Sequence, residues 1–453
     1  MRNCFARFNI LFVSLALVCL FQGAAAAEVH ENAEGTYAPN AGNANQAPAP
    51  NDAAAKYNTL TPYVTVSEEF NDNIFLSANN RKYDFITRVT PGFRLDYSAP
   101  FWTWRADASI SYLHFAKATE GDQLYPTVNV WGSMRPIRNL LYLDVSDSYS
   151  RVPLNYGYES LFTNQANQNF LTVSPYLKFH PLRRLELTTG YIYKNVIYDR
   201  PDTVDWQEHD VFARATHELT PRTSVFAQLL YAHTITSEDY RYDRWTASAG
   251  LDYNYADRSH FHIEGGYSLI NIAGAGDFGS PYWNVGINYA FGPWVAFANG
   301  GVTYNTDPYQ NITERRTING GLTREYRRGT ITLSAYYYTT KDYLINSVYQ
   351  KSYGLTLKVT HDFSGRLRGY AIGGVSRERG TTFATDFPYF VNRFEAPYHL
   401  ISFDTGLNYD MGEGLALFCS YGYRDYLYEG DLPNAYNNRV ILGITKTFRG
   451  WKF

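Results

Sequence analysis

Sulfur-containing residues and long apolar runs are scarce in this chain. Its 453 residues include only 3 Cys and 3 Met. Apart from the N-terminus, no stretch approaches the roughly 20 consecutive apolar residues that a membrane-spanning helix needs, which excludes a polytopic helical membrane protein. Cys4 and Cys19 fall in that N-terminal stretch. If it is removed, Cys419 is left alone and no intramolecular disulfide is expected.

Strong charge and catalytic motifs are also missing. The formal net charge is −3 and unclustered, so we expect no nucleic-acid partner. The sequence has no Gly-rich phosphate loop, no Cys pair and no zinc-protease helix, and we therefore expect no cofactor and no enzymatic activity. His260 and His262 share one face of a segment. Because no third ligand stands at a suitable spacing, we expect them to be structural and predict no metal site.

The N-terminal region has two parts. Arg2 and Arg7 precede the apolar run 10–21 and a group of small residues, which predicts a cleavable signal peptide over residues 1–27. Residues 28–58 are rich in Ala, Asn and Pro and predict a disordered periplasmic leader. Residues 59–453 then form the third and largest unit.

In this third unit, apolar and polar side chains alternate with period two, which is the period of a strand. In the segment 102–112, one face carries Trp102, Trp104, Ala106, Ala108, Ile110 and Tyr112, and the other carries Thr103, Arg105, Asp107, Ser109 and Ser111. The same division recurs along the chain, and we find no helix signal in this region. The fold class is therefore predicted to be all-β.

Nine tight turn signals punctuate these segments, at 99–100, 135–136, 180–181, 220–221, 256–257, 292–293, 328–329, 364–365 and 412–413. Longer polar connections lie between them, such as 71–83, 153–167 and 380–397. Short periplasmic turns that alternate with longer external loops are typical of outer-membrane barrels. Nine turns predict ten hairpins, and hence a single transmembrane antiparallel up-and-down β-barrel of about 20 strands.

Closure of the sheet satisfies every backbone hydrogen bond within hydrocarbon. The apolar face then meets lipid, and the polar face lines the lumen. The predicted lumen-lining residues are Arg88, Arg94, Asp96, Arg105, Asp107, Asp144, Lys178, Arg214, Glu218, Arg244, Asp252, Lys358, Arg366, Arg368 and Asp404. The predicted membrane-interface aromatics are Trp102, Trp104, Tyr253, Trp283 and Trp294. The mixed signs of the lumen charges predict a modest field.

The chain ends in an aromatic residue, which is the usual signal for insertion of an outer-membrane barrel. Trp451 and Phe453 are the predicted C-terminal insertion signal, although they fall out of register with Leu442 and Ile444. The expected location is the cell outer membrane. The expected partners are outer-membrane lipid and the barrel-insertion machinery.

Two runs near the start of the barrel region carry a family resemblance. Residues 62–75, PYVTVSEEFNDNIF, and residues 84–92, DFITRVTPG, resemble the opening of an outer-membrane β-barrel porin family whose members are often associated with exopolysaccharide and PEP-CTERM loci. The resemblance covers about 31 residues and carries over no catalytic residues. It implies a large single-chain barrel that serves as a conduit for a secreted polysaccharide, with periplasmic polysaccharide-export components as further partners.

Three functions are consistent with these observations. The first is a passive outer-membrane channel that serves exopolysaccharide export, and the second is a general diffusion porin for small hydrophilic solutes. Both need a wide, polar and charge-balanced bore, so the sequence does not separate them. The third, an outer-membrane hydrolase, lacks a convergent nucleophile and base. We expect the external loop 380–397 to constrict the lumen, and inward Tyr336 and Tyr338 to offer stacking surfaces for sugar rings.

Overall fold

The computed structural model of the chain describes residues 58–154, 165–201, 203–306, 312–343, 347–380, 397–430 and 432–452. None of these residues belongs to a helix long and apolar enough to cross a membrane. The predicted signal peptide, all but the last residue of the predicted leader, most of the loop 380–397 and Phe453 lie outside the described residues.

The described chain is a succession of strands. They are β1 (Thr59–Asn71), β2 (Asp84–Ala99), β3 (Trp102–Phe115), β4 (Gln123–Ile137), β5 (Leu141–Pro153), β6 (Gln165–Leu182), β7 (Leu185–Tyr198), β8 (Trp206–Thr220), β9 (Thr223–Thr236), β10 (Arg241–Ala256), β11 (Ser259–Ile272), β12 (Gly276–Phe291), β13 (Trp294–Thr306), β14 (Ile312–Tyr326), β15 (Gly329–Asp342), β16 (Ser347–Asp362), β17 (Leu367–Gly380), β18 (Tyr398–Gly412), β19 (Leu415–Tyr428), β20 (Ala435–Thr447) and the short β21 (Trp451–Lys452).

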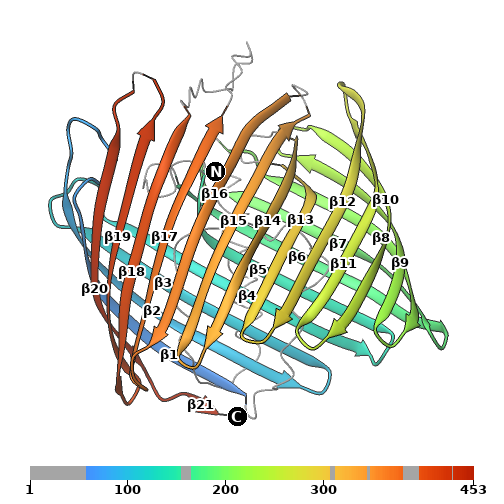
Figure 1. The fold of residues 1–453 in the computed structure, drawn as a ribbon, viewed down its shortest axis with the longest axis horizontal. Coiled ribbons are helices and arrows are strands. Elements are labelled where there is room, and N and C mark those ends of the chain that lie inside the picture. Colours follow the sequence, from blue (N-terminus) through green and yellow to red (C-terminus); the bar gives the residue numbers. More distant parts are fainter. Residues whose placement is uncertain are drawn as a thin grey trace, which may run out of the picture.

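The strands close into one barrel. Each strand from β1 to β19 pairs antiparallel with the next, and β20 pairs back with β1 from Tyr63↔Thr447 to Asn71↔Arg439. Figure 1 shows the strands tilted around the wall, with the front and back of the cylinder crossing each other in projection. The predicted fold class, an all-β antiparallel barrel of about 20 strands, is confirmed.

Each of the nine predicted turns corresponds to a short connection at one end of the barrel. Two of them lie a few residues later than predicted. Pro136 and Pro181 belong to the last residues of β4 and β6, and the ladder register shifts beside each of them. Because proline lacks an N–H donor, it is tolerated in a strand at such irregular positions, so here it marks the approach to the turn.

Connections at the opposite end differ widely in length. Residues 72–83 form a long one, as predicted, whereas residues 237–240 and 273–275 are as short as the turns. In the long connection, Asn73 is fully buried, and its side chain bonds the backbone oxygens of Ser77 and Tyr436. These amide contacts tie the connection to the start of β20.

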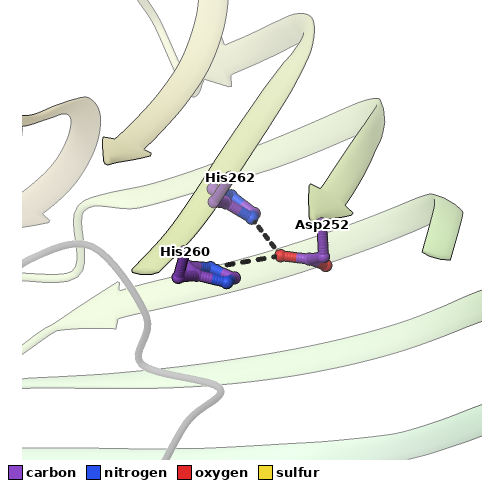
Figure 2. Close-up of side chains that lie close together, drawn as sticks. All are labelled: Asp252, His260 and His262. Carbon is purple, nitrogen blue, oxygen red and sulfur yellow. Dashed lines mark hydrogen bonds and ion pairs between the residues drawn. The ribbon is translucent and has the colours of Figure 1, made fainter. Parts of the chain in front are cut away.

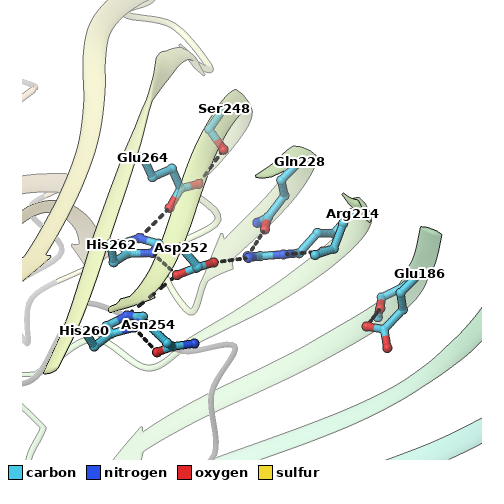
Figure 3. Close-up of polar contacts among 11 residues, drawn as sticks. Glu186, Arg214, Gln228, Ser248, Asp252, Asn254, His260, His262 and Glu264 are labelled. Carbon is cyan, nitrogen blue, oxygen red and sulfur yellow. Dashed lines mark hydrogen bonds and ion pairs between the residues drawn. The ribbon is translucent and has the colours of Figure 1, made fainter. Parts of the chain in front are cut away.

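The two faces of the wall differ in chemistry. Large apolar side chains such as Leu229, Trp245 and Leu442 stand about 60% exposed on one face. On the other face, polar side chains contact one another across strands, as Arg214 of β8 does with Asp252 of β10. Figure 3 shows these polar side chains projecting from the wall toward the barrel interior. An apolar outside and a polar inside are the arrangement of a transmembrane barrel.

The C-terminal strand explains the register mismatch seen in the sequence. β1 pairs with β20 up to Tyr63↔Thr447, and Phe448 N–H still bonds the Pro62 carbonyl. Leu60 then pairs with Trp451 rather than with Gly450. This slip of one residue moves Trp451, which is 59% exposed, onto the outer face. That it serves as an insertion signal remains a prediction.

Candidate functional site in the barrel interior

The interior near β1, β2 and β3 carries charges that are paired but partly exposed. Arg94 Nε lies 2.8 Å from Asp107 Oδ2, and the Tyr63 hydroxyl donates to Asp107 Oδ1 at 2.9 Å. The Arg94 and Asp107 side chains remain 24% and 42% exposed. Arg105 pairs with Asp96 at 3.6 Å. Opposite charges in contact leave little net field at this part of the wall.

The other residues predicted to line the lumen are mostly paired as well. The pairs are Arg88–Glu69, Lys178–Glu186, Arg214–Asp252, Arg244–Glu208, Arg368–Asp362 and Asp404–Arg424. Asp144, Glu218 and Lys358 lie across from Ser133, Ser224 and Thr332 in the ladders. Arg366 is the exception, because it lies in the turn between β16 and β17 and not within a strand.

Four of the five predicted interface aromatics lie within a few residues of a short turn. Trp102 and Trp294 begin β3 and β13. Trp104 packs over Gly132 of the neighbouring strand. Tyr253 stacks on Tyr255 with ring centroids 5.7 Å apart. Trp283 differs, because it lies in the middle of β12 and its ring packs over Gly300 of β13.

A second group of interior charges is buried, and of its members only Arg244 was predicted to line the lumen. Lys194 Nζ lies 2.6 Å from Glu208 Oε1 and 2.9 Å from Asp210 Oδ2, and all three side chains are at most 15% exposed. Arg244 of β10 lies 3.9 Å from Glu208 of β8. The Thr234 hydroxyl also donates to Glu208, at 2.9 Å. Such a network holds the wall strands β7 to β10 together from inside.

The ladder between β12 and β13 stops partway along the wall. The two strands pair from Phe291↔Trp294 only as far as Asn284↔Gly301. Beyond that point β12 continues to pair with β11, as far as Gly276↔Ile272, and β13 continues to pair with β14, as far as Thr306↔Ile312. The wall therefore divides at this level, between residues 276–283 on one side and 302–306 on the other.

Beyond the division, the ends of β13 and β14 pack against the inner face of β10, β11 and β12. We call residues 302–306 with 312–316 the inner tip. Tyr242 bonds Thr306 at 3.1 Å, the Arg244 guanidinium lies 4.9 Å from the Tyr304 ring centre, and Arg316 donates to Ser280 at 3.4 Å. Ile312 joins a buried apolar cluster with Tyr242, Ile270, Ile272 and Tyr343.

The part of the inner tip that begins β14 is buried on both faces, as expected for a strand inside the barrel. Ile312, Thr313 and Glu314 are consecutive residues, and each is at most 4% exposed. The Tyr343 hydroxyl and the Arg316 guanidinium both bond the Glu314 carboxylate. A wall strand of a transmembrane barrel would instead expose every second side chain to lipid. The tip therefore occupies space in the interior.

Local sequence explains why the wall divides here. Pro281 lies in the part of β12 that pairs with β11 but not with β13. Proline is found at such strand edges because it cannot donate a ladder hydrogen bond. Gly300 and Gly301 stand where β13 leaves β12. A Cβ added at Gly300 would come within 2.9 Å of the Trp283 ring and of the Thr317 carbonyl oxygen. Glycine thus lets Trp283 cover the point of division.

The predicted stacking tyrosines are only partly available. Tyr336 and Tyr338 stack with centroids 6.1 Å apart. However, Tyr338 is 8% exposed and lies beneath Arg315, whose guanidinium is 3.8 Å from the ring centre. Tyr142 and Tyr176, which face each other across β5 and β6, form a flatter stack at 5.2 Å and 6° and are less buried. They are a better surface for a sugar ring than Tyr338.

Comparison with known proteins identifies the fold of this chain but not a family. No family model matches the chain, and no curated protein matches it. The FrpB iron transporter from Neisseria meningitidis is similar in structure: its F5-1 variant in the apoprotein form has a TM-score of 0.51 at 9% identity, over 86% of this chain and 81% of that chain. The F3-3 variant gives 0.50 at 9% identity, over 87% and 82%.

OccK2 (OpdF) of Pseudomonas aeruginosa also matches, with a TM-score of 0.42 at 13% identity, over 86% of this chain and 98% of that chain. The matches to the FrpB transporter show that this chain shares its β-barrel fold.

Proposed function

We propose that this protein is a passive outer-membrane channel for neutral, hydrated carbohydrate, and that it serves exopolysaccharide export. The observation that carries the proposal is the pairing of charge on the inner face, where Arg94–Asp107, Arg105–Asp96 and Asp404–Arg424 each unite opposite signs within one contact. A wall of this kind attracts neither anions nor cations strongly. Uncharged polar solutes therefore suit it best.

Two further features support carbohydrate as the solute class. Tyr142 and Tyr176 offer a stacked pair of rings on the inner face, and aromatic faces pack well against the C–H faces of sugars. The runs 62–75 and 84–92 resemble a porin family associated with exopolysaccharide loci. On this proposal the further partners are periplasmic components of polysaccharide export, and the chain has no catalytic role.

A general diffusion porin is the second candidate, and the inner tip is the observation that favours it. Because the tip lies inside the wall, it narrows the interior on the side of β10 to β12. A narrowed bore selects small solutes over a bulky polymer. The predicted constriction by the loop 380–397 is not tested, because most of that loop lies outside the described residues.

Conductance of the purified protein in planar bilayers tests the channel proposal. We expect discrete openings with little preference between K⁺ and Cl⁻, and block or partitioning by neutral sugars. Strong selectivity for one ion, or the absence of openings in correctly folded protein, would contradict the proposal. Purified protein is also assayed for lipid and peptide hydrolysis, which we expect to be undetectable.

The role of the inner tip is tested by shortening it. Replacing residues 302–316 with an Asn-Gly turn, which favours a two-residue hairpin, should raise single-channel conductance because it removes side chains from the bore. The matched control replaces residues 237–240 in the same way, since the ladder from β9 to β10 already reaches Arg241↔Ile235. Equal conductance in both variants would show that the tip does not limit flow.

A deletion strain separates export from diffusion. Loss of surface polysaccharide with normal uptake of small sugars supports export, whereas slowed uptake with normal surface polysaccharide supports a diffusion porin. Complementation with the tip-shortened variant provides the internal comparison. If the tip acts as a size filter, this variant should admit larger sugars than the wild type.

A further inference from the structure

The inner face of β10 and β11 carries a cluster of metal-ligating side chains that the channel proposal does not use. His260 and His262 are alternate residues on β11, so they share a face. Asp252 of β10 is the direct ladder partner of His262. One candidate ligand atom from each of the three lies within 4.8 Å of the others. The third ligand is not apparent from the local spacing in the sequence because Asp252 belongs to another strand.

Figure 2 shows the two imidazole rings converging on one carboxylate oxygen. His262 Nδ1 lies 2.8 Å and His260 Nε2 lies 3.7 Å from Asp252 Oδ1. The side chains of Asp252 and His262 are 25% and 14% exposed, and that of His260 is 40% exposed. The cluster is therefore reachable from the lumen but largely shielded from bulk water.

Each of the three side chains is oriented by a second contact, which Figure 3 displays. His260 Nδ1 lies 2.9 Å from Asn254 Oδ1. Because an amide oxygen only accepts, this contact places the proton on Nδ1 and directs the Nε2 lone pair toward Asp252. His262 Nδ1 carries the proton of the 2.8 Å contact with Asp252 Oδ1, because a carboxylate only accepts, and its Nε2 lies 3.9 Å from Glu264 Oε2. Asp252 Oδ2 lies 3.7 Å from Arg214.

These outer contacts are themselves fixed. Glu264 is 5% exposed and accepts from the Ser248 hydroxyl at 2.5 Å. Phe226 stacks on His262 with ring centroids 5.8 Å apart and planes at 12°, and the Arg214 guanidinium lies 3.7 Å from the centre of the same Phe226 ring. Metal-binding histidines in proteins usually have such a carboxylate or carbonyl partner on the second nitrogen.

We propose that Asp252, His260 and His262 form a binding site for a divalent transition metal of the Zn²⁺ class on the lumenal wall. Two imidazole nitrogens and one carboxylate oxygen are a ligand set that Zn²⁺ accepts, with water completing the coordination. Binding displaces the proton between His262 Nδ1 and Asp252, which passes to solvent. Asp252 and Glu264 together outweigh Arg214 in charge, so the surroundings favour a cation.

The site has a consequence for the bore that does not depend on the proposed substrate. It lies a few residues from the short turn at 257–258, near one mouth of the barrel. A bound divalent cation would add positive charge to a wall whose other charges are mostly paired. Ion selectivity should then shift toward anions when the metal is present.

The test uses the full mature chain, folded in detergent, stripped with chelator and free of any histidine tag. Zn²⁺ is titrated in competition with a chromophoric chelator, and Co²⁺ replaces it for visible absorption. We expect one Zn²⁺ per chain and a Co²⁺ spectrum typical of nitrogen and oxygen ligands. His262→Gln and Asp252→Asn should each weaken binding at least tenfold.

Two further variants keep the result interpretable. Asn254→Ala touches only the outer contact of His260 and should weaken Zn²⁺ binding about tenfold, as loss of such partners generally does. His233→Gln is the matched control, because His233 also contacts an aspartate, Asp243 at 2.7 Å, but belongs to no group of three such ligands among the described residues. Its binding should equal that of the wild type.

The proposal is overturned if the wild type binds Zn²⁺ no more tightly than His262→Gln, or if Co²⁺ gives the same spectrum with both. Should His262→Gln fail to fold, the comparison of Asn254→Ala with His233→Gln decides the matter. Reversal potentials in planar bilayers give an independent readout. Micromolar Zn²⁺ should shift the wild type toward anions and leave Asp252→Asn unchanged.

Discussion

Two parts of the barrel interior hold their charges in opposite ways. Near β1, β2 and β3, the β1–β2 ladder runs from Thr59↔Asp96 to Asn71↔Asp84 without a break, and Arg94 and Asp107 meet while still partly exposed. Between β7 and β15, Lys194, Glu208 and Glu314 are almost completely buried, and the β12–β13 ladder is cut short.

The difference shows what the buried charges are for. An intact ladder fixes the wall by itself, so the charges beside it remain hydrated and contribute little to stability. Where the wall divides, the inner tip has to be held by side chains. A buried ion that has lost its partner is costly. Arg244, which contacts Glu208 and the Tyr304 ring, and Glu314, which bonds Tyr343 and Arg316, therefore make one packing strongly preferred.

Lys194→Met should be the most damaging substitution. It leaves the buried Glu208 and Asp210 carboxylates without their main cation, and removal of one partner from a buried pair costs about 3–5 kcal/mol. The matched control is Lys178→Met on the adjacent strand, because Lys178 and Glu186 are each about one-third exposed and such a pair is worth less than about 1 kcal/mol. Urea unfolding in detergent, followed by tryptophan fluorescence, measures both. An equal loss of unfolding free energy in the two variants would contradict the proposed contrast between buried and hydrated charges.

Gly300→Ala should have an intermediate effect. The added Cβ meets the Trp283 ring and the Thr317 carbonyl oxygen, and overpacking of this kind typically costs about 1–3 kcal/mol. Gly265→Ala is the control, because Gly265 is the ladder partner of Trp283 on its other side and has open space at its Cβ position. The unfolding midpoint should fall for the first variant and stay constant or rise for the second.

Asp107→Asn should have the smallest effect. Its two contacts, with Arg94 and Tyr63, lie in the hydrated part of the interior, so we expect a loss below about 1 kcal/mol. The substitution should mainly change ion selectivity, because Arg94 would be left without its nearest counter-charge. A modest shift of the reversal potential toward anions, without a change in unfolding midpoint, is the expected result. A large loss of stability would contradict the view that the hydrated charges near β1, β2 and β3 contribute little to stability.

The overall fold was readable from the sequence because it depends on local signals. Period-two alternation and punctuating turns predict both the strand count and the pairing of neighbours. Pro136 and Pro181 misplace two turns by a few residues, since proline also occurs at irregular strand positions. Trp451 could not be assigned to a face, because the slip beside Gly450 is visible only once β1 and the C-terminal residues are paired.

The division of the wall was not predicted, although its traces are in the sequence. Alternation continues through β13 and β14, so nothing in the period shows that the tip has left the wall. Pro281 in mid-strand and the adjacent Gly300 and Gly301 are the available signals. Asp252 could not be matched with His262 for a related reason, because cross-strand register depends on the turn between them. That turn includes a register shift between Asn254 and Ala256.

The closing pair of strands has a consequence for the order of assembly. Thr65 and Thr445 bond at 2.9 Å although 380 residues separate them. Among the described residues, every ladder outside this seam of β1 with β20 and β21 joins consecutive strands. Contacts between distant segments bear a loop-closure entropy that local hairpins do not, and they form slowly. We therefore expect closure of this seam to be the slowest step of folding. Until the seam closes, the folding sheet has two edge strands with unpaired backbone N–H and C=O groups. A chain truncated before β20 would keep both of these unpaired edges.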